Sequence, residues 1–275
     1  MRFVNRGCLV RGALYALLTL YLIFVLFPIV WLVLSSFKTH YQTLILPPKL
    51  IFKPTLQAYE KLLTGGMIKA FKNSLIIVGI DIVLALVFSI PAAYSLARFK
   101  TKLGENIGFW FLSIRMAPAF GVIVPLYIVI RNFRLLDTIF AVNISHLLLN
   151  LPFAIWLLKG YFEEMPIELE ESALIDGATR FQALLRIVLP ISLPMVVAVS
   201  ILTFIFSWNE FLFAFVLTSS SGVTVPVLVA SLAGTMRFDW PLMCAVSVGA
   251  MIPAFVFVFF VQRYIVRGLT LGALR

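Results

Sequence analysis

The chain has 275 residues, of which 62% are hydrophobic and only 12% carry a charge. Ordinary soluble domains are about 45–50% apolar and about 25% charged. A soluble chain of this size could not bury so much apolar surface, because larger chains divide into domains instead of enlarging one core. The composition therefore excludes a soluble enzyme, a disordered protein and a disulfide scaffold, and it indicates a polytopic membrane protein.

The net charge of +10 does not indicate a nucleic-acid-binding surface. The basic residues flank apolar stretches, where Lys and Arg anchor helix ends in the headgroup region. The two cysteines, Cys8 and Cys244, form no C-x-x-C motif, and His40 and His146 are far apart in the sequence. We therefore expect no disulfide, no metal site and no cofactor in this chain.

Six apolar stretches have the length of a membrane-spanning helix. A helix that crosses about 30 Å of hydrocarbon needs about 20 mainly apolar residues. The six stretches cover about residues 12–36, 74–97, 108–130, 140–158, 191–217 and 242–266. None shows the alternating pattern of a barrel strand. The sequence thus predicts an all-α membrane protein with six transmembrane helices, in which residues 1–275 form one transmembrane domain.

The first stretch is expected to stay in the mature protein. Arg2, Arg6 and Arg11 precede it as they would in a signal peptide, but the apolar run is longer than a signal core and no A-x-A cleavage site follows it. Six spans place both termini on one side of the membrane. Twelve Lys and Arg residues lie inside and nine outside if the termini are cytoplasmic, so the positive-inside rule favours that orientation.

The loop at about residues 159–190 is the most polar part of the chain. Pro166 suits the first turn of a short helix, where its missing N–H costs nothing. Gly177 suits the end of that helix, because glycine tolerates the left-handed conformation of a C-cap. Negative charge near the helix start favours the helix dipole, and three carboxylates lie there: Glu168, Glu170 and Glu171.

A second short helix is predicted from Arg180 to Leu189, ending against Pro190. Thr179 and Gln182 have the spacing of a capping box at its start. Two capped helices form a compact projection that suits docking into a cleft of a soluble partner. The alternative is a helix that lies on the lipid surface, but such helices usually carry Lys and Arg on their polar side, and this loop is acidic.

The same loop resembles a known motif. Glu171-Ser172-Ala173, Gly177 and Ile187-x-Leu189-Pro190 resemble the EAA loop of permease subunits from binding-protein-dependent ABC importers. One departure is Ser172, where the family usually has Ala. The likeness covers nearly the whole chain and is closest to the smaller six-span permease of the maltose and maltodextrin type. Further matching segments are Ser36-Phe37-Lys38, Asn73-Ser74-Leu75, Pro91-Ala92-Ala93-Tyr94, Trp208-Asn209-Glu210-Phe211 and Gly268-Leu269-Thr270.

The resemblance implies a non-enzymatic inner-membrane subunit whose cytoplasmic loop docks on a separate ATPase. The implied partners are a second permease subunit, two ATP-binding cassette ATPase subunits and an extracytoplasmic solute-binding protein. No G-x-x-x-x-G-K-[ST] sequence is present, which agrees with ATP binding on another subunit. The implied location is a prokaryotic cell membrane with both termini in the cytoplasm. The residues expected to couple the loop to the ATPase are Glu170, Glu171, Ser172, Ala173, Asp176, Gly177 and Ala178.

Charged groups inside the spans mark a pathway or a paired site, because charge is costly in lipid. Asp81, Arg115 and Glu210 are such groups. The segment Arg115 to Pro118 is expected to break its helix near Pro118. Candidate pathway or gate residues are Trp208, Asn209 and Glu210 in the fifth span, and Asn143 and His146, which share a face with Asn150, in the fourth. The alternative for all of them is a polar clamp between helices.

The function that these features predict is import of a carbohydrate, either a sugar, an oligosaccharide or a polyol. One alternative is a permease for a non-sugar solute such as glycerol-phosphate. Another is an integral membrane enzyme, but we find no H-E-x-x-H sequence and no nucleophile–base set. A stand-alone secondary carrier would usually show paired repeats with broken helices in corresponding positions, and no such repeat is found.

Overall fold

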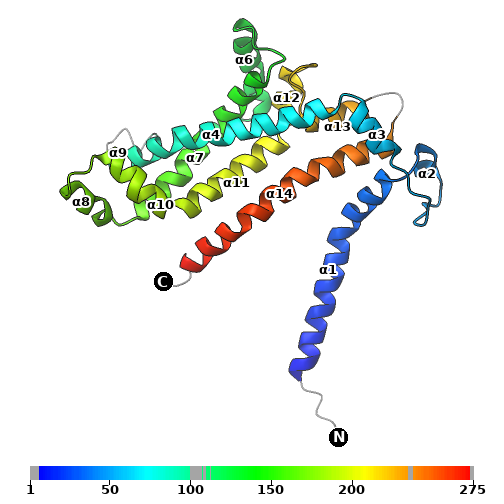
Figure 1. Cartoon of the computed structure of the whole chain (residues 1–275), viewed down its shortest axis with the longest axis horizontal. Helices are drawn as coiled ribbons and strands as arrows, with labels where there is room; N and C mark the ends of the chain where they lie inside the picture. Colours follow the sequence, from blue (N-terminus) through cyan, green and yellow to red (C-terminus); the bar gives the residue numbers. More distant parts are fainter. Residues whose placement is uncertain (1–5, 100–106, 108–109, 112, 235–237, 273–275) are drawn as a thin grey trace. The chain divides into compact units, whose positions relative to one another are not determined.

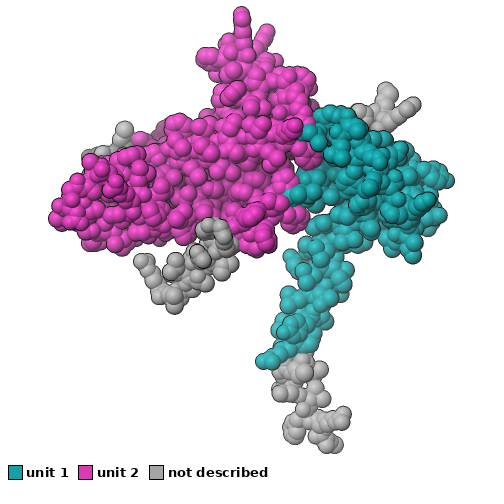
Figure 2. Space-filling view, viewed as in Figure 1, with its two compact units in different colours: residues 1–68, 229–252 teal, residues 69–228, 253–275 magenta. Residues whose placement is uncertain are grey.

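The computed structural model describes residues 6–99, 107, 110–111, 113–234 and 238–272. Within these residues all regular structure is helical, as the sequence predicts. The chain divides into two compact units, residues 1–68 with 229–252 and residues 69–228 with 253–275 (Figure 2). The prediction of one transmembrane domain over residues 1–275 stays a prediction.

The first unit contains the long helix α1 (Arg6–Ser36) and the short helices α2 (His40–Leu44) and α3 (Gln57–Thr64) (Figure 1). Residues 10–28 of α1 are exposed although they are almost entirely apolar, as expected for a helix that faces lipid. After α1, Thr39 and Gln42 form a capping box that starts α2. The Ser36 hydroxyl lies 2.7 Å from the Tyr59 hydroxyl and so links α1 to α3.

The second unit is built on three neighbouring helices, α4 (Ile68–Arg98), α7 (Ile139–Glu164) and α11 (Leu193–Asn209), which lie side by side in Figure 1. Small residues let the helix backbones approach closely: Ala93 and Ala154 are buried in their contact. Larger apolar side chains fill the rest of this core, namely Leu158, Phe162, Leu184, Val188 and Val199. Shorter helices here are α6 (Ala119–Asn132) and α12 (Leu212–Leu217).

Two further helices complete the described part of the chain, α13 (Val225–Ala233) and α14 (Trp240–Gly272). In the second unit, α14 contributes Phe257, whose ring stacks on Phe204 of α11 with 4.1 Å between centroids. The ring of Trp208 also stacks on Phe204, with 5.7 Å between centroids. Aromatic stacking therefore fixes α11 against α14.

The described residues contain four helices that are long and apolar enough to cross a membrane, where the sequence predicted six spans. They are Val10–Ser36, Ile68–Arg98, Ile139–Glu164 and Trp240–Gln262. A fifth is obtained if Arg180–Ile191 and Leu193–Asn209, which meet at 78°, count as one broken span. The predicted third span begins at Gly108, which lies outside the described residues.

Two of the predicted spans, the third and the fifth, are interrupted in the structure. Ala117 and Pro118 separate the helical turn at Ser113–Met116 from α6, because proline removes a backbone donor and disfavours helical geometry in the preceding residue. The predicted fifth span was expected to run unbroken to Leu217. In the structure α11 ends at Asn209, Glu210 is extended, and the helix resumes as α12.

The loop at about residues 159–190, called the coupling loop below, also differs in one detail from the prediction. Its second helix does not end against Pro190. It begins as α9 (Arg180–Ala183), continues through a π-helical turn (Leu184–Val188) and ends with α10 (Leu189–Ile191). Pro190 occupies the first turn of α10, where a missing N–H is tolerated.

Candidate functional site

The exit turn of helix α8 (Glu168–Ile175) is built as the sequence predicts, but the helix begins later than expected: Pro166 precedes the N-cap Ile167 and lies outside the first turn. Gly177 has φ of +87°, the left-handed conformation that glycine adopts without strain. The Ala178 N–H donates to the Ala173 carbonyl at 2.9 Å and the Gly177 N–H donates to the Leu174 carbonyl at 3.1 Å. This is the Schellman pattern of a helix C-terminus. Thr179 and Gln182 then form the predicted capping box of α9.

The coupling loop presents an acidic and apolar surface. Glu171, Ser172, Asp176 and Gly177 are exposed, whereas Ala173 and Ala178 are half-buried. Apolar side chains are exposed beside these residues, most of all Ile175, which is 85% exposed. A contiguous mixture of this kind is typical of a surface that binds another protein.

Glu170 is an exception among the predicted coupling residues, because its side chain is turned into this chain. It is 1% exposed and forms an ion pair with Arg98, the last residue of α4. The Arg98 Nε–H donates to Glu170 Oε1 at 2.7 Å and the Tyr94 hydroxyl donates to Oε2 at 2.8 Å. Both carboxylate oxygens are thus bound by α4.

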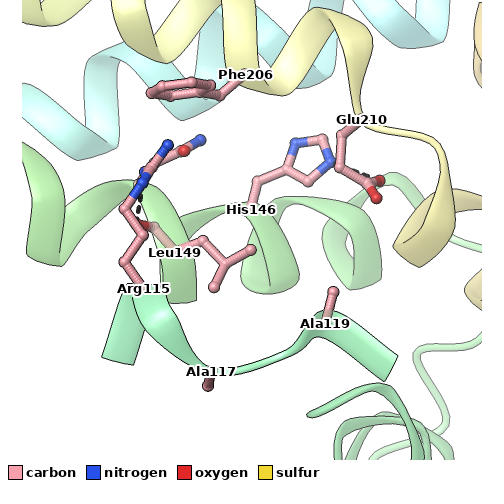
Figure 3. A pocket seen from close by; sticks show the side chains of 8 residues that line it. Arg115, Ala117, Ala119, His146, Leu149, Phe206 and Glu210 are labelled. Atoms are coloured by element: carbon pink, nitrogen blue, oxygen red, sulfur yellow. Dashed lines mark hydrogen bonds and ion pairs between the residues drawn. The ribbon is translucent and has the colours of Figure 1, made fainter. Parts of the chain in front are cut away.

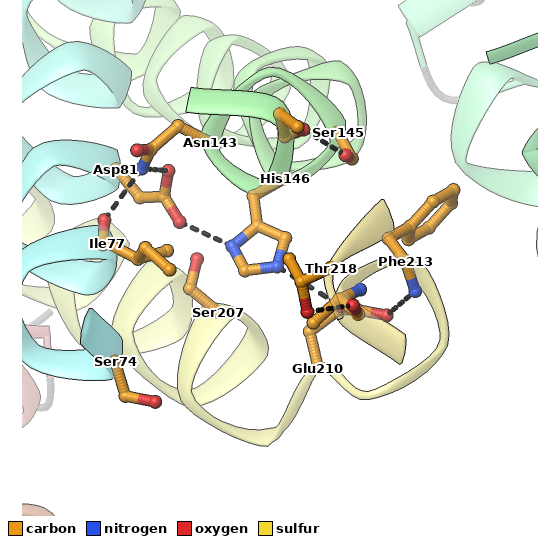
Figure 4. Close-up of polar contacts among 12 residues, drawn as sticks. Ser74, Ile77, Asp81, Asn143, Ser145, His146, Ser207, Glu210, Phe213 and Thr218 are labelled. Atoms are coloured by element: carbon orange, nitrogen blue, oxygen red, sulfur yellow. Dashed lines mark hydrogen bonds and ion pairs between the residues drawn. The ribbon is translucent and has the colours of Figure 1, made fainter. Parts of the chain in front are cut away.

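A second buried polar cluster joins α4, α7 and the break between α11 and α12 (Figure 4). Nδ1 of His146 on α7 lies 2.6 Å from Oδ2 of Asp81 on α4, and Nε2 lies 3.2 Å from Oε2 of Glu210. Asp81 and His146 are 0% and 3% exposed. An imidazole with a proton on each nitrogen donates to both carboxylates. One histidine therefore joins three separate segments of the chain.

Four further hydrogen bonds orient the ends of this cluster. Asn143 Nδ2 donates to Asp81 Oδ1 at 2.6 Å and to the Ile77 carbonyl at 2.9 Å. Glu210 accepts from the Phe213 N–H at 2.8 Å and from the Ala214 N–H at 3.1 Å. A carboxylate in this position satisfies the free donors of the first turn of α12. Glu210 thereby stabilises the break between α11 and α12.

A pocket of about 280 Å³ lies beside this cluster (Figure 3). Its wall contains both charge and aromatic surface, and its lining residues are Arg115, Ala117, Ala119, His146, Leu149, Asn150, Phe206 and Glu210. The guanidinium of Arg115 contacts two rings, at 4.2 Å from the centroid of Phe153 and 4.0 Å from that of Phe206. Cation–π contacts of this kind stabilise a positive charge.

Of the five predicted pathway residues, two line the pocket and three do not. His146 and Glu210 line the pocket. Trp208 is buried against Phe204, and Asn143 is buried against α4. Asn209 is exposed, and its amide donates to the Ile205 carbonyl of its own helix. Asn150, four residues after His146 on α7, also lines the pocket and donates to the Ser207 hydroxyl at 3.0 Å.

Three participants were not predicted as site residues. Arg98 was counted only as one of many basic residues at helix ends, although its spacing of four from Tyr94 places the two side chains on one helix face. Phe206 and Phe153 gave no signal among so many aromatic residues. No cluster of three or more His, Cys, Asp or Glu side chains suited to a metal ion occurs among the described residues, and His146 engages both ring nitrogens with carboxylates.

A loop outside the spans is organised by Asp137. Its carboxylate accepts hydrogen bonds from the backbone N–H groups of residues 219–222, at 2.8 to 3.2 Å. Desolvation by burial raises the pKa of Asp137, but the hydrogen bonds from the Ser219, Ser220 and Ser221 N–H groups outweigh it and hold the pKa below its ordinary value. Asn73 holds the same loop by donating to the Ser221 and Val223 carbonyls.

Comparison with known proteins identifies the family. Residues 85–271 match the family described as "Binding-protein-dependent transport system inner membrane component". The trehalose/maltose transport system permease protein MalG of Thermococcus litoralis is 32% identical over 99% of this chain and 98% of its own length. The trehalose transport system permease protein SugB of Mycobacterium tuberculosis is 34% identical over 96% and 98%.

A third relative and a solved structure agree with these matches. The sulfoquinovosyl glycerol transport system permease protein SmoH of Agrobacterium fabrum is 32% identical over 91% of this chain and 89% of its own. The fold is shared with a chain of a bacterial ABC transporter involved in the import of the acidic polysaccharide alginate. That chain has a TM-score of 0.79 at 23% identity, with 96% of this chain and 99% of that chain covered. The chain therefore belongs to the inner membrane components of binding-protein-dependent transport systems, as a multi-pass ABC importer permease of the carbohydrate type.

Proposed function

We propose that this chain forms half of the pathway by which an ATP-driven importer moves a carbohydrate across the cell membrane. In this proposal it crosses the membrane six times with both termini in the cytoplasm. It pairs with a second permease subunit, receives solute from an extracytoplasmic binding protein, and is driven by two separate ATPase subunits.

The observation that carries the proposal is the capped loop formed by α8 and α9. The left-handed Gly177 and the Thr179 capping box set the angle between α8 and α9. The exposed face of the loop therefore has a defined orientation. That face combines the carboxylates of Glu171 and Asp176 with the apolar Ile175. It suits a groove that offers basic groups around an apolar floor, as a docking ATPase would.

Transmission from the loop to the pathway is supported by chain continuity. The loop continues through α10 and the bend at Ser192 into α11. At the far end of α11 lies Glu210, which lines the pocket. A displacement of the loop would therefore act directly on a helix whose end forms the pocket wall.

A carbohydrate is the favoured solute class. The relatives named above are transporters of trehalose, maltose and sulfoquinovosyl glycerol by name, and a structure of the alginate transporter is a complex with an alginate-bound periplasmic protein. The pocket offers hydrogen-bonding groups suited to sugar hydroxyls. The alternative of an anionic solute such as glycerol-phosphate has one observation in its favour, the Arg115 guanidinium in the pocket wall.

Reconstitution tests the proposal. The chain is co-expressed with its partner permease and ATPase subunits, purified, and placed in liposomes with the binding protein. We expect an ATPase to copurify, and binding protein loaded with a member of a panel (trehalose, maltose, sulfoquinovosyl glycerol, glycerol 3-phosphate) to stimulate ATP hydrolysis and uptake. A chain that purifies without an ATPase and transports on its own would contradict the proposal.

A further inference from the structure

We infer that Arg98 is a positioning residue that fastens the coupling helix α8 to α4 and α7, so that these three helices move as one body. The inference rests on the proposed coupling role of α8. It assigns transmission of the ATPase movement to a buried joint inside this chain, in addition to the exposed loop surface.

The guanidinium of Arg98 is shared among three elements. Its Nε–H donates to Glu170 of α8 at 2.7 Å, and its Nη2 lies 2.6 Å from the same oxygen. Nη1 donates to the Phe162 carbonyl at 2.6 Å and Nη2 to the Met165 carbonyl at 3.3 Å. These carbonyls belong to the last turn of α7 and its C-cap, where the Phe162 carbonyl also accepts from the Met165 N–H at 3.3 Å. One side chain from α4 thus binds both neighbours.

The joint is closed on the other side by Tyr94, one turn earlier on α4. Its hydroxyl donates to the second oxygen of Glu170, and its ring meets that of Phe162 edge-on at 6.3 Å. Arg180 from α9 lies over the ring of Phe99, directly after α4, at 5.1 Å. The end of α4 is therefore bound to α7, α8 and α9.

Burial makes this joint difficult to open. The side chains of Arg98 and Glu170 are 5% and 2% exposed. Separating a buried ion pair leaves two charges without compensation in a medium that solvates them poorly, and the planar fork of arginine cannot be replaced by a point charge in this geometry. The pair is expected to stay closed throughout the transport cycle, so a force on α8 displaces α4 and α7 with it.

This arrangement gives the loop a second route to the pocket. Asp81 precedes Arg98 on α4 by seventeen residues, about 26 Å along a helix at 1.5 Å per residue. Asp81 binds His146, and His146 contacts Glu210 in the pocket wall. The first route runs through α11, as described above, and the second through α4. Both end at Glu210.

The test measures whether α4 and α8 remain fixed to each other. Cys8 and Cys244 are replaced by Ser, and spin labels are attached at Ser95→Cys and Glu168→Cys, two exposed positions on α4 and α8. Distances are recorded in the whole transporter in liposomes, without nucleotide and after trapping with ATP, Mg²⁺ and vanadate. We expect one narrow distribution that is the same in both states.

Three substitutions are then introduced separately: Arg98→Gln, Glu170→Gln and Tyr94→Phe. We expect the first two to broaden the distribution and make it depend on nucleotide, and to lower the ratio of stimulated to basal ATP hydrolysis about tenfold, a typical size for coupling between linked sites. Tyr94→Phe should change the distance distribution and the ATP hydrolysis ratio in the same direction, but by a smaller amount. The control is Glu163→Gln, which breaks the exposed Lys159–Glu163 pair of α7 and should change neither.

The outcomes are distinct. Unchanged distances and ATPase ratio in Arg98→Gln would overturn the inference. If that variant does not assemble, Tyr94→Phe decides, and wild-type values there would overturn it. A wild-type complex that shows no stimulated ATP hydrolysis would contradict the proposed function instead.

Discussion

Asp81 of α4 and His146 of α7 are in contact at 2.6 Å, and both residues are buried. A hydrogen-bonded pair of this kind costs free energy if either partner is removed, because the other is left unsatisfied away from water. The pair therefore specifies how α4 and α7 are aligned. It also holds the imidazole in the orientation that reaches Glu210, so the wall of the pocket depends on a residue that does not line it.

We predict that Asp81→Asn destabilises the complex and raises its basal ATP hydrolysis. The new amide places a donor against either Asn143 Nδ2 or His146 Nδ1, and one buried donor loses its acceptor at a cost of about 1–3 kcal/mol. The measurements are thermal unfolding of the purified complex and ATP hydrolysis without binding protein. Ser89→Ala is a matched control, because Ser89 is fully buried on the same helix and its hydroxyl has no partner among the described atoms. Equal effects of the two substitutions would show that Asp81 has no special role.

Glu210→Ala should lower uptake much more than Asn209→Ala. Glu210 caps α12 and contacts His146, and loss of a helix cap alone costs about 0.5–2 kcal/mol. Asn209 is exposed and donates to the Ile205 carbonyl of its own helix. If Glu210 holds a gate, basal ATP hydrolysis rises in the variant. If it contacts solute, the apparent affinity for solute changes instead. Wild-type uptake, affinity and basal hydrolysis in Glu210→Ala would leave it as a packing residue.

Glu171→Lys should abolish most transport while the complex still inserts and the chain still folds. The residue is exposed on α8, so the substitution disturbs no packing, but it reverses a charge that we expect to meet basic groups of the ATPase. ATPase retention on a tagged permease and solute uptake are the measurements. Glu164→Lys serves as the control, because Glu164 is an exposed carboxylate at the end of α7 and lies outside the motif. Normal uptake by the Glu171 variant would exclude it from coupling.

The sequence predicted local features of the loop well and long-range partners poorly. The turn at Gly177 and the cap at Thr179 depend on residues within four positions of each other, so propensity and spacing suffice to predict them. Glu170 and Glu171 are adjacent and chemically identical, and only the fold shows that the first is bound by Arg98 and the second is exposed. The break at Glu210 also depends on long-range partners and was therefore missed. The helix ends where the Glu210 carboxylate contacts both His146 and the first N–H groups of α12.

Gly177→Val should uncouple ATP hydrolysis from uptake, or release the ATPase. A side chain at Gly177 meets no atom within 4 Å, so space does not limit the substitution, but φ is +87°. A residue with a Cβ is less stable there by about 1–2 kcal/mol, and α9 would leave α8 in a different direction. Gly160→Val is the matched control for crowding, because Gly160 also has open space but lies within α7 at ordinary helical geometry. Full uptake with normal ATPase retention in Gly177→Val would contradict the role of the turn.

The last prediction concerns Asp137 and the loop that it holds. Asp137→Asn keeps one acceptor oxygen but turns an N–H₂ group toward the Ser221 N–H and the Ser220 hydroxyl, both of which donate to Oδ2 in the wild type. We expect this to weaken the loop by about 1–3 kcal/mol. Amide hydrogen exchange of residues 219–222, followed by mass spectrometry, should speed up by about tenfold or more.

The pH dependence of this loop follows from the pKa of Asp137. Because folding lowers that pKa, the contribution of Asp137 to the stability of the loop is complete above the ordinary value of 3.8. It is lost only as the pH falls toward the lower pKa of the folded state. The ratio of the protection factors of wild type and variant should therefore be constant between about pH 5 and pH 8, the range in which most folded proteins are most stable. A wild-type loop whose protection falls between about pH 7 and pH 5 would show that a different group, and not the carboxylate of Asp137, holds it in place.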